Sequence, residues 1–519
     1  YSQNVRTRSV LAVAAAGLMV TSCLSTDPGL QATRAVPQTI PAPNDAVPGV
    51  SGTSTVDSVP FDSTPSVNSV PADKDPNRDF AVESGVVDFG DSKTSRDYDG
   101  FLVAVVKDIQ GFWNDQFSAV YGSPFRPLDG GIHAAYRDRR TRIPGCGQRV
   151  TRYDDVQGNA FYCSIGDFMV YDDDQLIPTL VDQLGRSAVG VVLAHEFGHA
   201  VQARADELNE PTVLKEQQAD CFAGAWTAHI VRGENDDFQF DDRDVRAGLI
   251  AMIQVADPVE VSGLNDADAH GTGFDRVGAF QDGFVGGVER CKPFFTENRQ
   301  LVQIPFRVDP NNGNFPLHDP ANQGQDVATA IPKSLTTFWT TLLATKSVTF
   351  TPPALVLYPS AGPFPACEGA KQTAFRRNVF YCRSTNQIMA DESMGESLIA
   401  NIGDMSMGYL ISQGFSEAVQ DAMNSPLRGE ERVLQNDCLT GVWSRALVPG
   451  ASPETPTADT IPVADRISLS AGDLDEAVIT AIQRSDPSSA TNQRGSAFEK
   501  IAAFREGVLR GAAGCQALN

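Results

Sequence analysis

The stretch that decides the fold covers residues 187–207 and reads SAVGVVLAHEFGHAVQARADE. It contains no proline, and its apolar side chains at Val189, Leu193, Phe197 and Val201 recur near the spacing of one helix face. This pattern predicts a helix across the stretch. The polar residues within it are therefore arranged by helical geometry.

Two histidines and a glutamate on this predicted helix form a metal-binding pattern. His195 and His199 are four residues apart, so both imidazoles project from one face and can bind the same cation. Glu196 is turned away from direct ligation and toward a metal-bound water, where hydrolysis needs a general base. The chain has only 6 histidines, so chance rarely produces this pairing around a glutamate. The alternative is an amphipathic helix whose two histidines have structural partners.

A third ligand is needed, because a catalytic zinc takes three protein ligands and keeps one position open. A second helix is predicted from Val213 to Val231, with Gly233 as its stop. On it, Glu216 is the candidate ligand. Asp220 lies four residues later on the same face and is the candidate acceptor of a proton from a ligand imidazole, for which we favour His195. The alternative is that both acids are solvated helix charges.

The chemistry that follows is hydrolysis with Zn2+ as cofactor. Zinc lowers the pKa of its water toward about 7, Glu196 takes the proton, and hydroxide attacks a polarised carbonyl. His270 is the candidate for a further transition-state donor, against the commoner alternative of a structural histidine. We expect His133, His229 and His318 to be structural or surface residues.

Two similar halves follow residue 95, each with the same cysteine-centred motifs. Matching segments are Cys146 with Phe161-Tyr162-Cys163 against Cys367 with Phe380-Tyr381-Cys382, Asp220-Cys221 to Trp226 against Asp437-Cys438 to Trp443, and Phe280, Gly283, Gly287 and Cys291 against Phe504, Gly507, Gly511 and Cys515. We predict an α+β domain over residues 96–298, a connector over 299–324, and a second copy of the same fold over 325–519.

The second copy lacks the metal ligands. The places of His195, Glu196 and His199 are taken by Gln413, Gly414 and Glu417, in that order. Val433 stands roughly at the place of Glu216. No histidine follows His318. We therefore expect a degenerate, metal-free copy.

The cysteines predict a disulfide framework. Setting Cys23 aside leaves eight of the 9 cysteines, and two equivalent sets of four allow three pairings each. We favour four pairs: Cys146–Cys163, Cys221–Cys291, Cys367–Cys382 and Cys438–Cys515. The alternative is free, buried thiols.

The first 95 residues indicate export. The apolar run from Val10 to Val20 follows two arginines and is too short to span a bilayer, which predicts a signal peptide over residues 1–22. It ends in VTSC, which resembles a bacterial lipobox, so we expect lipid on Cys23 and a disordered tether over residues 23–95. The alternative is an ordinary secretory signal with an incidental cysteine. The chain opens with Tyr1, and we expect the reading frame to start further upstream.

Net charge limits the partners. Lys and Arg total 41 against 65 Asp and Glu, and the resulting charge of −24 repels nucleic acid and anionic lipid. We expect a peptide or protein substrate, no nucleic acid, and membrane contact only through the lipid anchor, on the outer face of the bacterial cell membrane.

These motifs resemble the bacterial neutral zinc metallopeptidase family, whose pattern is His-Glu-x-Gly-His, then Glu-x-x-x-Asp-Cys-x-Ala-Gly, then His-Gly-Thr and a late Cys. The resemblance covers residues 96–298 and implies a zincin-like fold of the gluzincin type. It also implies a strand lining the cleft, placed at Asp167–Tyr171, that holds an extended peptide by strand addition.

The predicted function is thus zinc-dependent hydrolysis of peptide bonds outside the cell membrane. One alternative is a surface lipoprotein with structural zinc that binds a partner. The other is an amidase that cuts cell-wall peptides. The presence of Glu196 favours an enzyme, because a structural zinc site needs no base.

Overall fold

A computed structural model of the chain describes residues 70–147, 151–254, 271–297, 299, 301, 313–322, 324–448, 467–470, 472–485 and 494–515. The predicted signal peptide, the predicted lipidation site Cys23, the tether as far as residue 69 and His270 all lie outside these residues. Within the described ranges, no helix is both long enough and apolar enough to cross a bilayer.

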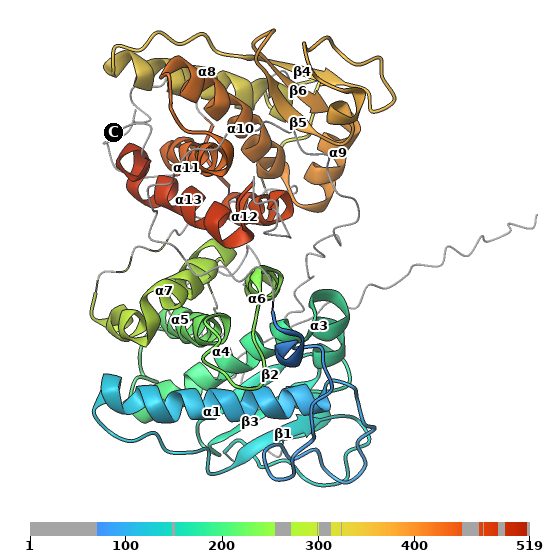
Figure 1. Cartoon of the computed structure of the whole chain (residues 1–519), viewed down its shortest axis with the longest axis vertical. Coiled ribbons are helices and arrows are strands. Elements are labelled where there is room, and N and C mark those ends of the chain that lie inside the picture. The colour runs from blue at the N-terminus through green and yellow to red at the C-terminus, as the bar shows by residue number, and fades with distance from the viewer. Residues whose placement is uncertain are drawn as a thin grey trace, which may run out of the picture.

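Two halves follow one another along the long axis of the molecule (Figure 1). The first contains α1 (Asp99–Tyr121), β1 (Gly131–Ala135), α2 (Tyr153–Val156), β2 (Ala160–Cys163), β3 (Phe168–Asp172), α3 (Leu176–Leu184), α4 (Arg186–Ala205), α5 (Thr212–Val231), α6 (Asp242–Gln254) and α7 (Gly273–Cys291). The second contains α8 (Val327–Thr345), β4 (Ala354–Tyr358), β5 (Val379–Cys382), β6 (Gln387–Asp391), α9 (Glu392–Asn401), α10 (Asp404–Ala422), α11 (Gly429–Leu447), α12 (Asp473–Arg484) and α13 (Ala497–Arg510). The fold is of the mixed α+β class and is rich in helix.

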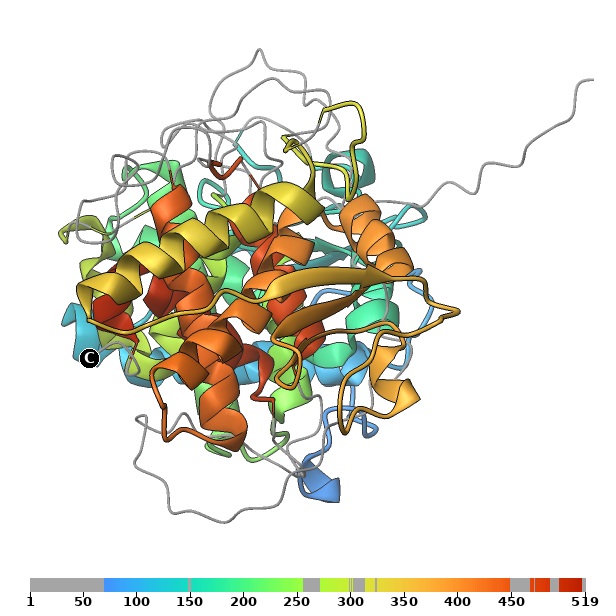
Figure 2. The same cartoon turned by 90° about the horizontal axis from the view of Figure 1, so that it is seen from above.

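Each half holds one small mixed sheet. In the first, β3 is the central strand and pairs in parallel with β1 and antiparallel with β2. In the second, β6 is central, in parallel with β4 and antiparallel with β5. Seen along the long axis, α8 and the second sheet lie in front of the first half (Figure 2).

The strand predicted at Asp167–Tyr171 corresponds to β3, but its expected role is wrong. Both edges of β3 are already hydrogen-bonded to neighbouring strands, and all of its side chains are buried. A strand in the middle of a sheet has no free backbone edge, so it cannot hold a peptide by strand addition. The sequence identified a strand but gave no information about its position in the sheet.

The two helices that carry the metal-binding pattern match the prediction to within two residues. α4 begins after Gly185, which has a φ of 93°. It ends at Ala205, and the next residue, Asp206, has a left-handed backbone conformation with a φ of 62°. α5 begins directly after Pro211. α4 contacts β2 on one side and α5 on the other, and α5 in turn packs against α7.

Helices α5 and α7 cross at glycines. A Cβ atom on Gly224 would lie 1.9 Å from the carbonyl oxygen of Phe280, and one on Gly283 would lie 1.7 Å from that of Cys221. Only residues without a side chain permit such a close approach. The second half repeats this crossing between α11 and α13, where Gly441 faces Phe504 and Gly507 faces Cys438.

Four disulfides join the pairs favoured from the sequence: Cys146–Cys163, Cys221–Cys291, Cys367–Cys382 and Cys438–Cys515. In each half, one bridge ties the antiparallel edge strand to the preceding loop. The other ties the two helices that cross at glycines, α5 to α7 and α11 to α13. The bridges therefore stabilise equivalent places.

The expectation of a disordered tether as far as Ser95 is wrong for residues 70–95, which pack on the first half. The Phe80 ring lies 5.5 Å from that of Phe101, and Val87 is only 4% exposed. Asp88 forms a parallel β-bridge with His133. A few apolar side chains, spaced among prolines and polar residues, are enough to dock a segment onto an existing core, and average composition does not reveal them.

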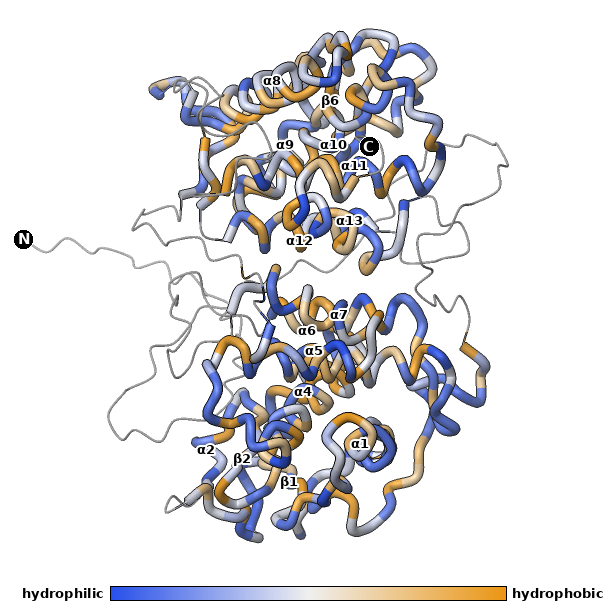
Figure 3. Tube along the Cα trace, turned by 90° about the vertical axis from the view of Figure 1, so that its left-hand side faces the viewer, coloured by the Kyte–Doolittle hydropathy of each residue, from blue (hydrophilic) through white to orange (hydrophobic). Residues whose placement is uncertain are grey.

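The two halves meet through helices α6 and α7 on one side and α12 and α13 on the other (Figures 1 and 3). These pairs occupy the same places in the two orders of elements. Each half thus presents its last two helices to the other.

Candidate metal centre

Three buried side chains converge between α4 and α5. His195 Nε2 lies 3.2 Å from one carboxylate oxygen of Glu216, and His199 Nε2 lies 3.4 Å from the other. The two imidazole centroids are 4.9 Å apart, with their planes at 90°. All three residues are at most 3% exposed. The structure therefore brings together the three ligands proposed from the sequence.

The spacing of these atoms fits a zinc ion. Ligand atoms at about 2.0–2.1 Å from a tetrahedral zinc are roughly 3.3–3.4 Å from one another, close to both distances above. His199 Nε2 is buried and has no hydrogen-bond partner among the described residues. Two neutral imidazoles and one carboxylate are also a donor set that zinc prefers.

Asp220 holds the ring of His195 in place. Its Oδ1 lies 2.8 Å from His195 Nδ1, and because a carboxylate only accepts, the ring donates there and turns Nε2 toward Glu216. Burial by itself lowers the pKa of His195, but Asp220 and Glu216 raise it to about 10. The two carboxylates therefore favour a positive charge at this place, which either a proton on the imidazole or a bound cation can supply.

Arg276 of α7 holds Asp220 in turn. The guanidinium donates from Nε to Oδ2 and from Nη2 to Oδ1 of Asp220, each at 2.8 Å, and both residues are fully buried. Burial alone would raise the pKa of Asp220, but Arg276 and His195 lower it below 3.8. Arg276 was not predicted from the sequence, since a single arginine 56 positions from its partner leaves no local signal.

Gln202 holds the ring of His199 in place, as Asp220 holds the ring of His195. His199 Nδ1 lies 3.0 Å from Gln202 Oε1, while Gln202 Nε2 donates to the carbonyl of Lys215 at 2.7 Å and to Gln218 Oε1 at 3.0 Å. Because the amide nitrogen is engaged elsewhere, its oxygen accepts from the imidazole. Gln202 was not proposed from the sequence, although its recurrence as Gln420 in the second half was a usable signal.

Glu196, the proposed base, is fully buried on α4 beside His195. The remaining histidines lie elsewhere. His133 contacts Asp88 at 3.0 Å and the Gly130 carbonyl at 2.7 Å, and His318 is an exposed residue 3.4 Å from Glu392.

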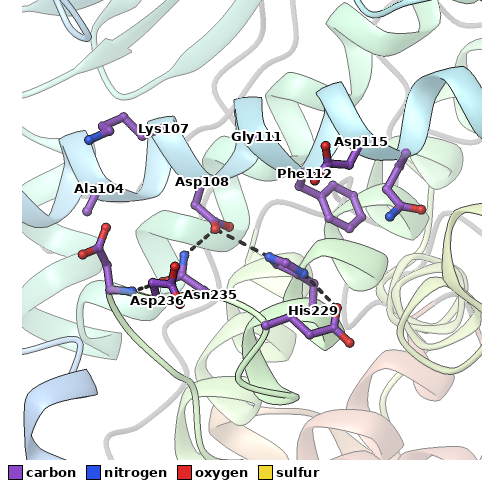
Figure 4. A pocket seen from close by; sticks show the side chains of 12 residues that line it. Ala104, Lys107, Asp108, Gly111, Phe112, Asp115, His229, Asn235 and Asp236 are labelled. Atoms are coloured by element: carbon purple, nitrogen blue, oxygen red, sulfur yellow. Dashed lines mark hydrogen bonds and ion pairs between the residues drawn. The ribbon is translucent and has the colours of Figure 1, made fainter.

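His229 lines a separate cavity of about 410 Å³ between α1 and the end of α5 (Figure 4). Its Nδ1 lies 2.9 Å from Glu234 and its Nε2 lies 3.5 Å from Asp108, which also accepts from Trp226 Nε1 at 2.7 Å. Burial alone lowers the pKa of His229, but the two carboxylates raise it. None of the three proposed ligands lines this cavity, and His229 lies apart from them.

The equivalent place in the second half has hydrogen bonds instead of ligands. Gln413 donates to Asp437 at 3.0 Å and to Thr440 at 3.1 Å. Glu417 accepts from Arg432 at 2.8 Å and from Asn436 at 2.7 Å. Both side chains therefore form hydrogen bonds with residues of α11.

Another acidic group lies at the starts of α10 and α12, where Asp404, Asp473 and Glu476 are buried together. Each accepts a bond from a backbone N–H, donated by Phe315, Ser470 and Met405 respectively. Burial raises the pKa of all three, that of Asp404 to about 6, and repulsion from neighbouring carboxylates raises the pKa of Asp473 and Glu476 further.

Comparison with known proteins points to the same half of the chain. Residues 91–294 match a family model described as "Putative neutral zinc metallopeptidase". "Uncharacterized protein YpfJ" of Escherichia coli (strain K12) is 28% identical over 218 residues, which cover 37% of this chain and 70% of that protein. "Uncharacterized protein Rv2575" of Mycobacterium tuberculosis (strain ATCC 25618 / H37Rv) is 31% identical over 152 residues, 24% of this chain and 52% of that protein.

No solved structure matches the chain. The description of the family suggests a zinc-dependent hydrolase, which is the class that the geometry of the buried centre also indicates.

Proposed function

We propose that this protein is a zinc-dependent peptidase with its centre at His195, His199 and Glu216. The observation that carries the proposal is the convergence of two imidazoles and a carboxylate at a spacing that fits zinc. The Nδ1 atom of each imidazole is hydrogen-bonded, to Asp220 in one case and to Gln202 in the other. A structural site is usually closed by four protein ligands, whereas three leave a position for water. The family description supports a peptidase.

The residues of the chain divide the work of hydrolysis. Zinc, when bound, supplies a Lewis acid that makes water more acidic and polarises a carbonyl. Asp220 and Gln202 hold the two imidazoles in the orientation that ligation needs. Glu196 would accept the proton of the attacking water as its oxygen adds to the carbonyl carbon and forms the new C–O bond. It would then pass the proton to the leaving nitrogen as the peptide C–N bond breaks.

An extended peptide requires an unpaired strand edge, and the edge strand beside the active helix is β2. Among the described strands it pairs only with β3, and it contacts α4. We assign peptide binding by strand addition to β2 in place of β3.

The second half is, in this proposal, a degenerate copy of the first. The strand order, disulfide pattern and glycine crossing of helices recur in both. The residues at the three ligand positions are different: Gln413, Glu417 and Val433 stand where the first half has His195, His199 and Glu216. The second half therefore folds without catalytic zinc and keeps a structural role.

The protein acts, we propose, outside the bacterial cell membrane, held by lipid on Cys23. Four disulfides support this location, because such bridges persist in oxidising compartments. A Cys23→Ala variant should move from the membrane fraction to the soluble exported fraction. Retention of that variant on the membrane would contradict lipid anchoring.

The test of the function uses the wild type, Glu196→Gln and His199→Ala, each assayed for zinc content and for turnover of casein and of peptidoglycan. Wild type should bind one zinc and cleave casein. Glu196→Gln should keep the metal and lose roughly 100- to 10,000-fold in rate, the usual contribution of a general base. His199→Ala should lose both metal and turnover.

The same assay separates the alternatives. Turnover of peptidoglycan without casein would indicate the cell-wall amidase. Zinc binding with equal turnover in wild type and Glu196→Gln would remove the enzyme proposal and leave a zinc-containing binding lipoprotein.

A further inference from the structure

We propose that Asp475, a residue of the second half, is a positioning residue for the metal centre of the first half. This inference rests on the proposed function, since it assigns a role at the same zinc site. The route runs from Asp475 to the first turn of α7, then through Arg276 and Asp220 to His195. It gives the metal-free half a defined part in the chemistry of its neighbour.

The first step is the start of α7, which the second half caps. Asp475 of α12 accepts from the backbone N–H of Gly273 at 3.0 Å and from that of Phe274 at 2.7 Å, with one carboxylate oxygen for each. The third N–H, of Asp275, donates to Thr272 Oγ1 at 3.2 Å. The first N–H groups of a helix have no partner inside it, and a carboxylate there also complements the helix dipole. Two of the first three are thus satisfied from the other half.

The second step is the contact that continues along one face of α7. Arg505 of α13 donates to the carbonyl of Phe274 at 2.8 Å and lies over the Phe274 ring. The same guanidinium occupies the space of the missing side chain at Gly278, where a Cβ would lie 1.9 Å from it. Further along, Gln281 donates to the Phe498 carbonyl at 2.9 Å. The second half therefore fixes the position of α7 over several turns.

The third step is the opposite face of α7, which points to the metal centre. Arg276 follows Phe274 by two residues, or roughly 200° around the helix, and so projects away from the second half. It makes the two 2.8 Å bonds to Asp220 described above, and Asp220 bonds His195 Nδ1. A shift at the start of α7 therefore moves the guanidinium that fixes the acid behind a metal ligand.

The consequence is a coupling between the cap and the zinc site. No contact joins Asp475 to the three proposed ligands among the described residues, so its effect passes through α7, whose direct contact with the acid behind His195 is made by Arg276. Removing the hydrogen-bond partner of a ligand histidine typically lowers metal affinity by about 10- to 100-fold. Displacing Arg276 leaves Asp220 in place but less firmly held, so we expect a loss of zinc affinity near the lower end of that range.

The experiment compares full-length wild type with Asp475→Ala, Asp475→Asn and a matched control, Lys500→Met. Lys500 bonds Asp437 at 2.7 Å inside the second half, so its loss destabilises that half without touching the cap of α7. Three quantities are measured: zinc affinity by competition with a chelator, the visible spectrum of the cobalt(II) form, and kcat and KM for casein peptides.

The expected result is specific to the cap. Asp475→Ala should weaken zinc binding by about tenfold, change the cobalt spectrum and lower kcat more than it changes KM. Asp475→Asn keeps one acceptor oxygen and should recover part of each effect. Lys500→Met should lower the unfolding temperature and leave zinc affinity and the cobalt spectrum as in wild type. If Asp475→Ala does not fold, the nearly isosteric Asp475→Asn provides the same comparison with a smaller shift.

Several outcomes would overturn the inference. One is that both Asp475 variants unfold at lower temperature while zinc affinity and the cobalt spectrum stay unchanged, which would make the cap purely structural. Another is that Lys500→Met reproduces the loss of zinc affinity. The two proposals fail separately: if wild type binds zinc and the Asp475 variants perturb it, but no form cleaves peptides, the positioning role stands and the peptidase proposal falls. A wild type that binds no zinc overturns both.

Discussion

Helices α4 and α5 of the first half and helices α10 and α11 of the second make the same kind of buried contact and use it differently. In the first half, His195 bonds Asp220, and Arg276 holds that acid from α7. In the second half, Gln413 bonds Asp437, and Lys500 holds that acid from α13. The acid and its cation occur in both places, whereas the ligands occur in one.

The comparison shows which contacts are common to both halves and so serve the fold, and which occur only at the candidate metal centre. The acid–cation pair ties the crossing helices together in both halves, so it serves the fold irrespective of any metal. Only where a histidine replaces the glutamine does the same acid also orient a ligand. The pKa values of the two acids differ with their partners. Burial raises the pKa of Asp437 although Lys500 opposes it, whereas Arg276 and His195 together lower the pKa of Asp220 against the effect of burial.

The largest effect should come from breaking the pair in each half. Arg276→Met leaves the buried Asp220 without its cation, and removing one partner of such a pair costs about 3–5 kcal/mol. Calorimetry should show that loss, and zinc affinity should fall with it. Lys500→Met should cost a similar amount with zinc affinity retained. Unchanged zinc affinity in Arg276→Met would mean that Asp220 needs no support from α7.

The glycine crossing offers a second matched pair. Gly283→Ala would place a Cβ 1.7 Å from the Cys221 carbonyl, and Gly507→Ala would place one 2.0 Å from that of Cys438. Overpacking of this kind costs about 1–3 kcal/mol, so both variants should unfold at lower temperature. Only Gly283→Ala should also weaken zinc binding, because α5 carries Glu216. Equal zinc affinities in the two variants would show that the crossing of α5 and α7 does not set the ligand geometry.

A third prediction concerns pH and the acids of the second half. The pKa of Asp404, Asp473 and Glu476 is raised in the folded state, so the folded protein binds more protons than the unfolded chain. The contribution of these three acids to stability is therefore fully present below the ordinary carboxyl pKa and is lost as pH rises through about 4 to 6 and above. Asp473→Asn should flatten this fall and raise the free energy of unfolding at pH 7.5. The free energy of unfolding measured in urea from pH 4 to 8 tests it, and a steeper fall in the variant would contradict it.

The smallest effect should come from the glutamines at the ends of α4 and α10. Gln202→Ala removes the partner of His199 and should weaken zinc binding by about tenfold. Gln420→Ala removes an amide that donates to the Arg432 carbonyl at 2.9 Å and should change stability alone. Chelator competition and thermal unfolding separate the two effects. Loss of zinc affinity in Gln420→Ala would show that the halves are more tightly coupled than their contacts indicate.

Much of this centre follows from local sequence. Residues 187–207 encode a helix through their apolar spacing, and that helix places His195 and His199 on one face because positions four apart always share a face. The same rule placed Glu216 with Asp220. Comparing the two halves then reduced the disulfide problem to a few pairings, because equivalent cysteines pair alike.

Only the tertiary structure decided the rest. Whether β3 is a central or an edge strand depends on which segments pair with it, and hydrophobic patterning carries no such information. Arg276 and Asp475 act through contacts between residues 56 and about 200 positions apart, which no local spacing reveals. Local geometry is fixed by the chain's own dihedral preferences, whereas the partners of a buried charge are fixed by the packing of elements that are distant in sequence.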